Sequence, residues 1–507
     1  RHQIGVPSRD GRRRRFEAIA AIVVFGIVYA ILRIPIWHLN LPYYDDGETL
    51  YHAFAILQGL VPYRDDCNHH FVGYVIPYVV ASKVIGFGPS IIKIVAWVTQ
   101  VSNAFGIYLC ARIFVGYRWA VLSGCALLAA REPLVLAFFV QYQVNFFIIW
   151  IWYFCLRACF SGSSGNLYIA SLLAGMAFCC DQRALALAWC PASLWFLAAF
   201  SRSQTTLRFP ARDLLVMSAC WAIFPGIALV YLAANQAIAP FVEQTLIFPT
   251  LFRAPGSAST WVEKSLATHK YLLHTPWLLM GGLFGFAALF GSAVRRQMRP
   301  DKALAVRFLL FACVPLAAMP IVGGREFDYY TITWLPYLAL LSVLAIDLLS
   351  SRTGWEKIPV TFFLVLGIAF PFFVVLNIRC WENIRKYRGD GIDETIAFLQ
   401  EEVDPSSSMY VWGYRPEIYV RLRRLSPFPF VNMITISPDT QIKSNRKARV
   451  FPKHEAMFLD LLSSQPPDHV VIFWRGLKWG PSSSRAAASL FQLVDADYTC
   501  LLYTSDA

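Results

Sequence analysis

RRRRFEAIAAIVVFGIVYAILRIPIWH, residues 12–38, begins with four arginines and continues as a long, mostly apolar run. The run from Phe16 to His38 is long enough to cross a bilayer as one helix. It is too long for the apolar core of a secretory signal, and no small-residue cleavage site follows it. We therefore expect a retained first span with the arginines in the cytoplasm.

The same composition recurs along the chain, since 57% of its 507 residues are hydrophobic and only 15% are charged. An ordinary soluble protein carries about 25% charged residues. With the first, we expect about eleven spans in a polytopic α-helical membrane protein. The further spans are predicted at residues 91–113, 118–140, 145–160, 167–181, 184–200, 213–235, 275–294, 303–322, 329–349 and 358–378. An odd number of spans places the C-terminal region outside the cytoplasm.

The net charge of +13 is explained by basic residues that fall in the predicted inner loops. These residues are Arg112, Arg118, Arg157, Arg202, Arg208, Arg212, Arg295, Arg296, Arg299, Lys302, Arg352 and Lys357. No basic stretch carries the interleaved aromatic residues of a platform for single-stranded nucleic acid. We therefore expect membrane lipids, and no nucleic acid, among its partners.

Two regions outside the spans are expected on the outer face. Residues 40–90 predict a first extracytoplasmic loop with interfacial segments, because treating residues 71–88 as a span would invert every later basic loop. Residues 381–507 are polar and mix helix-like with strand-like stretches, the latter at 409–413 and 470–474. The sequence thus divides into a membrane domain, 1–380, and a small extracytoplasmic α/β domain, 381–507.

Acidic and basic residues gather at this outer surface. LPYYDDGETLYHAF, residues 41–54, follows the first span, and RDDCNHH, residues 64–70, lies further along the same loop. A carboxylate can take a proton from an acceptor, and a cation can stabilise a departing phosphate. Both kinds of residue favour a transferase that uses a lipid-phosphate donor. The residues in question are Asp45, Asp46, Glu48, Arg64, Asp65, Asp66, His69, His70, Asp181, Arg183, Arg325, Asp328 and Tyr329.

DDGETLYHAFAILQGLVPYRDDCNHHFVGY, residues 45–74, resembles the first extracytoplasmic loop of bacterial GT-C glycosyltransferases of the protein-mannosyltransferase type. Further similar segments follow in the family's order and extend the resemblance over most of the chain. They are GFGPSIIKIVAWV (86–98), AGMAFCCDQRALALA (174–188), GGREFDYYTITWLPYLALL (323–341) and YVWGYRPEIYV (410–420).

The resemblance implies a GT-C-like fold in a bacterial plasma membrane, with the N-terminus cytoplasmic and the C-terminal domain extracytoplasmic. It implies transfer of a sugar from a polyprenyl-phosphate donor to a lipid, glycan or protein acceptor, with inversion at the anomeric carbon. The family's catalytic aspartate falls on Asp45, with Asp46 in support where a glutamate is usual. The candidates for binding the donor phosphate or substrate are Arg64, Asp65, His69, His70, Arg183, Arg325 and Tyr329.

Several positions depart from the family's pattern and leave alternatives open. Asn68, His69 and His70 replace an Asp-His-Lys segment, so the lysine expected near the donor phosphate is missing, and Asn145 stands where an acid is usual. The chain is then either an enzyme that uses other cations, which we favour, or a diverged, non-catalytic subunit of envelope glycan assembly. A lipid or solute transporter is a further alternative, suggested by Arg131 and Glu132 inside a span.

A metal site is the last alternative in this loop. His69 and His70 with Asp65 or Asp66 are residue types that bind a divalent cation, but no defined ligand spacing supports such a site. The sequence therefore predicts no metal ligand with certainty, and hydrogen-bonded loop histidines are the simpler interpretation.

Overall fold

The computed structural model describes most of the chain, and the description that follows covers those residues only. They are residues 9–33, 44–130, 140–200, 209–248, 276–294, 300–323, 328–353, 391–431, 433–437, 450–473 and 484–499, together with Glu263 and Leu272. Arg131, Glu132 and Arg325 lie outside them, as does the predicted domain boundary at residue 380.

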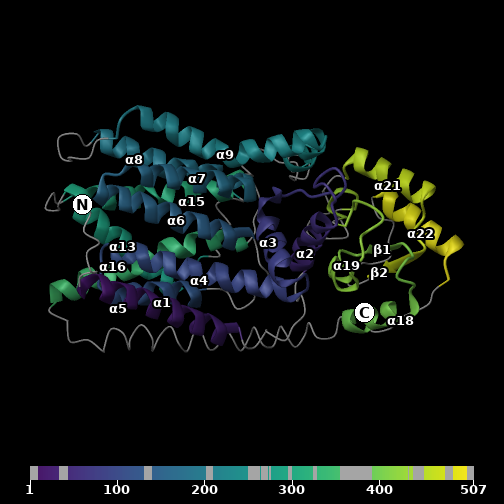
Figure 1. The fold of residues 1–507 in the computed structure, drawn as a ribbon, viewed down its shortest axis with the longest axis horizontal. Helices are drawn as coiled ribbons and strands as arrows, with labels where there is room; N and C mark the ends of the chain where they lie inside the picture. Colours follow the sequence, from purple (N-terminus) through teal and green to yellow (C-terminus); the bar gives the residue numbers. More distant parts are fainter. Residues whose placement is uncertain are drawn as a thin grey trace, which may run out of the picture.

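Long helices form the membrane part of the molecule and run along its length in Figure 1. Their bounds are α1 Arg9–Arg33, α4 Ser90–Arg112, α5 Tyr117–Ala129, α6 Val140–Ser161, α7 Ser164–Cys180, α8 Trp189–Phe200, α9 Arg212–Ala234, α13 Pro276–Val294, α14 Pro300–Phe311, α15 Cys313–Gly323 and α16 Leu335–Thr353. Shorter elements join them: α10 Ile238–Val242, the π-helix η4 Glu243–Ile247, and the 3-10 helices η3 Gln182–Ala188 and η6 Asp328–Trp334.

Six stretches of the described residues are long and apolar enough to cross a membrane. Within the most apolar windows of α4 and α6, 61% of the residues are buried inside the molecule, whereas only 6% are buried in α9. An apolar helix with so little protein around it would face lipid, and we therefore assign α9 to the edge of the bundle. The helical membrane architecture agrees with the sequence prediction.

The first loop forms helices of its own between the bundle and the C-terminal elements (Figure 1). Helix α2 covers Tyr44–Leu57, and the 3-10 helix η2, Val72–Val75, leads into α3, Ile76–Ile85. The apolar stretch Val72–Ile85 is shorter than a spanning helix, which fits the expected interfacial segment.

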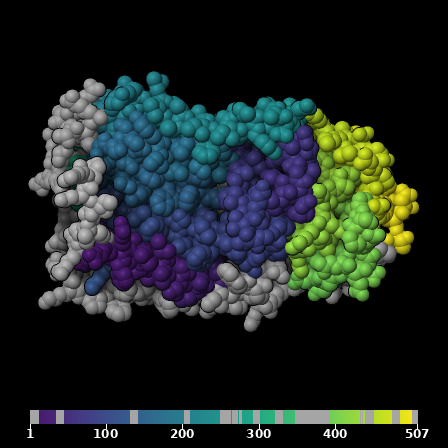
Figure 2. All heavy atoms as spheres, in the orientation of Figure 1, coloured from purple at the N-terminus to yellow at the C-terminus, as the bar shows by residue number. Residues whose placement is uncertain are grey.

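The C-terminal elements gather at one end of the molecule, where Figure 2 shows them against the first-loop segment. Strand β1, Met409–Trp412, pairs in parallel with β2, His469–Ile472, and Trp412 lies opposite Ile472. The predicted strands coincide with both. The surrounding helices are α18 Ile392–Glu402, α19 Glu417–Leu422, η8 Met433–Thr435, α21 Pro452–Ser464 and α22 Arg485–Asp497.

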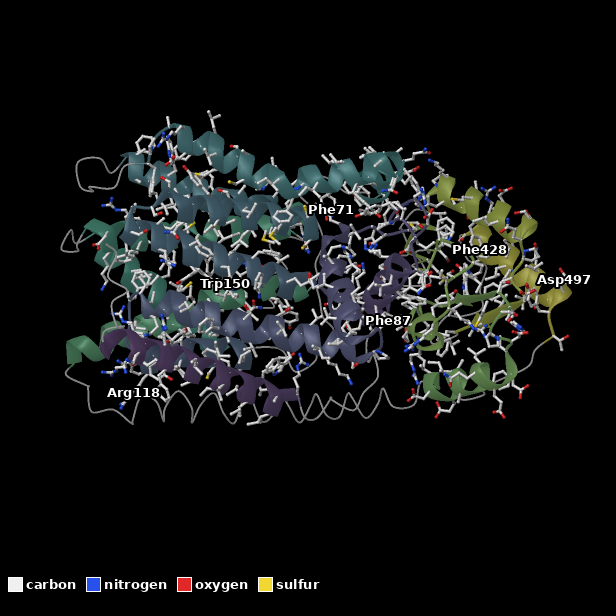
Figure 3. All side chains as sticks on the ribbon, in the orientation of Figure 1. Phe71, Phe87, Arg118, Trp150, Phe428 and Asp497 are labelled. Carbon is white, nitrogen blue, oxygen red and sulfur yellow. The ribbon has the colours of Figure 1, made fainter. Side chains whose placement is uncertain are left out.

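An aromatic core holds these elements together and includes one residue of the first loop. Tyr410, Trp412, Phe428 and Phe458 are buried in one cluster, and Cys67 packs into the same cluster. The backbone N–H of Cys67 donates to the carbonyl of Pro429 at 2.9 Å. The loop and the C-terminal elements therefore share a core instead of meeting at a loose surface. Figure 3 shows Phe428 at this end and Arg118 near the opposite end of the bundle.

Candidate functional site

Helix α2 carries most of the candidate acids. Asp45 and Asp46 lie in its first turn, where the helix dipole favours negative charge. Residues four apart lie on one face of a helix, so Glu48 and His52 are neighbours. Asp46, Glu48 and His52 are 1%, 4% and 1% exposed, and Asp45 is partly buried. These acids are therefore folded into the protein and do not form a fully solvated loop.

His52 lies between two carboxylates. Its Nδ1 contacts Asp66, and its Nε2 lies 3.4 Å from a carboxylate oxygen of Glu48. Burial alone would lower the pKa of His52, but the charges and hydrogen bonds of Asp66 and Glu48 raise it to about 10. The ring is therefore an imidazolium at neutral pH, and it supplies a positive charge among the acids.

Asp45, which is partly buried, and Glu48, which is buried, have opposite protonation behaviour. Burial, followed by the charge of Glu48, raises the pKa of Asp45 to about 7. Burial also acts on Glu48, but the hydrogen bond and charge of His52 hold its pKa well below the usual range. Glu48 is therefore a fixed anion, whereas Asp45 gains and loses a proton near neutral pH, as a general base requires. In the following, Asp45, Glu48, His52 and Asp66 are called the α2 acid cluster.

A tyrosine from the C-terminal elements completes this arrangement. The Tyr414 hydroxyl lies 2.9 Å from Asp45 Oδ1 and also contacts Glu48. Tyr414 follows β1 in a turn whose backbone is left-handed, with φ of 124° at Gly413 and 55° at Tyr414. Behind it, Arg415 and Glu417 form a buried ion pair at 3.0 Å.

Two glycines allow the close contacts that assemble the site. A Cβ on Gly47 would lie 2.8 Å from the backbone N of Glu417, so only glycine lets α2 approach α19 this closely. A Cβ on Gly73 would lie 2.3 Å from the carbonyl O of Cys179, near the end of α7. The first loop is therefore pressed against both the C-terminal elements and the membrane bundle.

The histidines of the loop face the same region. The backbone N–H of His70 donates to Asn68 Oδ1 at 2.8 Å, and the ring centroids of His69 and His70 lie 4.0 Å apart. Burial lowers the pKa of His70, which keeps its ring neutral. The charge of His69 acts on Glu48, and the charges of Asp181 and Arg183 act on His70.

Asp181 and Arg183 join the loop at the C-terminal end of α7. Asp181 caps η3 by accepting from the Arg183 backbone N–H at 2.8 Å, and its carboxylate also accepts from the Arg183 guanidinium, with Nε at 2.9 Å. The pair is 4% and 9% exposed. The expected convergence of the first loop with residues 181–183 is therefore seen in the structure.

Other predicted site residues lie elsewhere. Arg64 and Asp65 pair with one another at 2.8 Å, and Arg64 also donates to the carbonyl of Asn235 at 3.2 Å beyond the end of α9. The Arg64 side chain is 44% exposed, so the Arg64–Asp65 ion pair lies at the surface of the protein. Asp46 lies near Tyr78 of α3. Burial raises the pKa of Tyr78, and the charge of Asp46 raises it further. Tyr329 lies in η6, but the position of its side chain is not among the described ones.

Sequence reasoning missed His52 and Tyr414. The spacing of Glu48 and His52 was a signal for the first, since it places an acid and a base one helical turn apart. Tyr414 lies within YVWGYRPEIYV, where no local spacing connects it to the acids of α2.

The acidic and histidine side chains of the cluster are paired with each other. Each nitrogen of His52 faces a different carboxylate, so the ring separates Glu48 from Asp66. Within the described residues, no group of three or more His, Cys, Asp or Glu side chains has the arrangement of a metal site.

Comparison with known proteins gives the fold a class. No protein-family model matches the chain, and a search of curated proteins finds no relative. Among solved structures, it is similar to the archaeal oligosaccharyltransferase AglB from Archaeoglobus fulgidus, in complex with an inhibitory peptide and a dolichol-phosphate. The identity is 12% and the TM-score 0.55, over 82% of this chain and 64% of AglB. The chain thus spans less than two thirds of AglB.

A second similar structure is matched over most of both chains. ArnT from Cupriavidus metallidurans bound to undecaprenyl phosphate is 14% identical, with a TM-score of 0.56 over 88% of this chain and 94% of ArnT. The apo state of ArnT gives 15% identity and the same TM-score. The chain therefore has the fold of the GT-C superfamily of membrane glycosyltransferases.

Proposed function

We propose that this protein is a membrane glycosyltransferase that transfers a sugar from a polyprenyl-phosphate donor to an acceptor on the outer face, with Asp45 as general base. One observation carries the proposal: Asp45, a partly buried carboxylate whose pKa is raised to about 7, lies beside the fixed anion Glu48 where the first loop meets the C-terminal elements. The GT-C fold supports it. AglB and ArnT were solved with a dolichol-phosphate and undecaprenyl phosphate, respectively.

The proposed reaction is a single displacement. The ionised Asp45 takes a proton from the acceptor, whose oxygen or nitrogen forms a bond to the anomeric carbon. The bond from that carbon to the phosphate oxygen breaks, and polyprenyl phosphate leaves with the electron pair. One displacement inverts the anomeric carbon. The apolar bundle holds the prenyl chain, Asp46 supports α2 beside the base, and the C-terminal elements help to bind the acceptor.

We infer that His70 and Arg183 bind the leaving phosphate, because they lie beside one another near the α2 acid cluster. A neutral His70 donates an N–H, and Arg183 supplies positive charge that Asp181 balances before the donor binds. Arg325, His69 and Tyr329 remain candidates for contacts to the donor. Arg64 and Asp65 are assigned to the surface of the same loop, where they would contact lipid head groups.

The test is Asp45→Asn in membranes supplied with labelled polyprenyl-phosphate sugar. Loss of a general base lowers the transfer rate by roughly 10²–10⁴-fold. Asp460→Asn is the matched control, since Asp460 is an exposed acid on α21 and its replacement leaves transfer unchanged. Full transfer by Asp45→Asn would sink the assignment of the base.

The same assay separates the two other functions. A donor lipid that binds the wild-type protein without any transfer product indicates a non-catalytic subunit. Net movement of the labelled lipid across sealed vesicles, again without product, indicates a transporter or flippase.

A further inference from the structure

We propose that Tyr414 is a positioning residue for Asp45, so that the base is complete only when the C-terminal elements are docked on α2. This inference rests on the proposed function of Asp45 and adds a second segment of the chain to the reaction. It makes the C-terminal elements part of the catalytic machinery, in addition to any role in binding the acceptor.

The hydroxyl of Tyr414 contacts the proposed base directly. The Tyr414 hydroxyl reaches Asp45 Oδ1 at 2.9 Å and also contacts Glu48, although both acids belong to a helix 366 or more positions earlier in the sequence. A phenol has one proton to donate, so Tyr414 shares it between the two carboxylates. Donation to Asp45 stabilises the ionised carboxylate, which is the form that acts as a base.

The turn after β1 holds Tyr414 in a backbone conformation that costs free energy. A residue with a side chain rarely adopts the left-handed backbone that Tyr414 has at φ 55°. Such strain persists where the surroundings enforce it. Here they do: Arg415 pairs with Glu417 and its guanidinium lies 4.8 Å from the ring centroid of Phe473, while Glu417 abuts Gly47 of α2.

The elements packed around the site carry several charged or titratable groups. Helix α2 contributes Asp46, Glu48 and His52, and the rest of the first loop contributes Asp66, His69 and His70. The 3-10 helix η3 contributes the Asp181–Arg183 pair, and the turn after β1 contributes Tyr414, Arg415 and Glu417. Burial and the charge of Glu48 raise the pKa of Asp45, and the Tyr414 hydrogen bond opposes them. Removing the hydroxyl therefore raises the pKa of Asp45 further.

The test compares full-length Tyr414→Phe with wild type in native membranes, measuring the initial rate of transfer across pH. The acid limb of the rate profile moves up by about one pH unit, so the rate near pH 6 falls roughly tenfold while the two proteins converge at high pH. Tyr410→Phe is the matched control. It removes a buried hydroxyl that donates to the Phe430 carbonyl at 3.1 Å and leaves the limb in place.

A second readout does not depend on transfer. Hydrophobic carbodiimides modify protonated carboxyl groups, so mass spectrometry of Asp45 across pH follows its protonation directly. The midpoint moves up in Tyr414→Phe. If Tyr414→Phe does not accumulate, 3-fluorotyrosine at position 414 strengthens the donor without changing its size, and the midpoint moves down.

The outcomes distinguish the two proposals. A wild-type protein without transfer, but with a midpoint that responds to Tyr414, overturns the proposed function and leaves the link between Tyr414 and Asp45. Active wild type with an unmoved limb and midpoint in Tyr414→Phe overturns the inference and leaves the proposed function.

Discussion

His52 shows at the scale of one residue how the buried acids are tolerated. Unpaired charges are costly in a protein interior, and Glu48 and Asp66 are 4% and 5% exposed. The imidazolium between them removes this cost. In the proposed reaction, His52 contacts neither the transferred proton nor the donor. We therefore assign His52 the role of positioning Glu48. The fixed charge of Glu48 in turn raises the pKa of Asp45.

Replacing His52 is therefore predicted to destabilise the protein. His52→Gln keeps a hydrogen-bond donor but leaves two buried carboxylates without their cation, which typically costs about 3–5 kcal/mol. Because the folded-state pKa of His52 is raised, its contribution is fully present below the ordinary histidine pKa and is lost as pH rises to about 10. Thermal unfolding of the solubilised protein between pH 6 and pH 10 measures both effects.

The control for this prediction is built into the pH dependence. Wild type loses thermal stability as pH rises through this range, and His52→Gln, which has no group titrating there at this position, loses less. Equal slopes for the two proteins would contradict the assignment of His52 as a buried cation.

Asp45 and Tyr414 show which parts of the site could be predicted from the sequence. Asp45 and Asp46 drew attention as acids that follow an apolar run, and the resemblance of residues 45–74 to a family loop then implied their catalytic roles. Tyr414 lies 369 positions from Asp45, and no periodicity or spacing connects them. Its contribution depends on a left-handed turn and on packing between distant segments, which a single sequence does not encode in any local pattern.

At the scale of helices and strands, the predictions that agree with the structure rest on local patterns in the sequence. Among the described residues, six of the predicted apolar runs form stretches of helix long enough to span a membrane. The strands at 409–413 and 470–474 were predicted from β-branched and aromatic residues. The 3-10 helices η3 and η6 were not predicted, because both continue the apolar composition of a span. Yet η3 is what places Arg183 beside the first loop, through its Asp181 cap.

The contact between α2 and α19 gives a prediction about one glycine. Gly47→Ala places a Cβ 2.8 Å from the backbone of Glu417, so α19 must move away from α2. Overpacking of this kind costs about 1–3 kcal/mol. Since Tyr414 precedes α19, the displacement also weakens its bond to Asp45, and transfer falls more at low pH than at high pH. Rate profiles and thermal unfolding of the variant measure the two effects.

Gly88→Ala is the matched control for this substitution. Gly88 lies between α3 and α4, and an added Cβ there has no neighbour within 4 Å. Its rate profile and unfolding temperature stay close to those of wild type. If Gly47→Ala behaved in the same way, the tight contact between α2 and α19 would not be needed to place Tyr414.

At the scale of the whole molecule, the proposed function requires a fixed orientation in the membrane. The α6–α7 turn lies at the end of the bundle remote from the C-terminal elements, because α6 begins beside the first loop, where Gln143 Nε2 donates to the carbonyl of Tyr74 at 2.9 Å, and α7 returns to it. We expect this remote end to be cytoplasmic, because basic residues such as Arg157 fall there.

Two serines exposed at these opposite ends allow the orientation to be measured in intact cells. Ser464→Cys, on α21, is predicted to react with a membrane-impermeant maleimide, whereas Ser163→Cys, in the α6–α7 turn, reacts only after the membrane is permeabilised. The unaltered chain gives the background, which should be low because the cysteines among the described residues are buried or partly buried. Labelling of Ser163→Cys alone would place the α2 acid cluster on the cytoplasmic side, where a donor presented at the outer face could not reach Asp45.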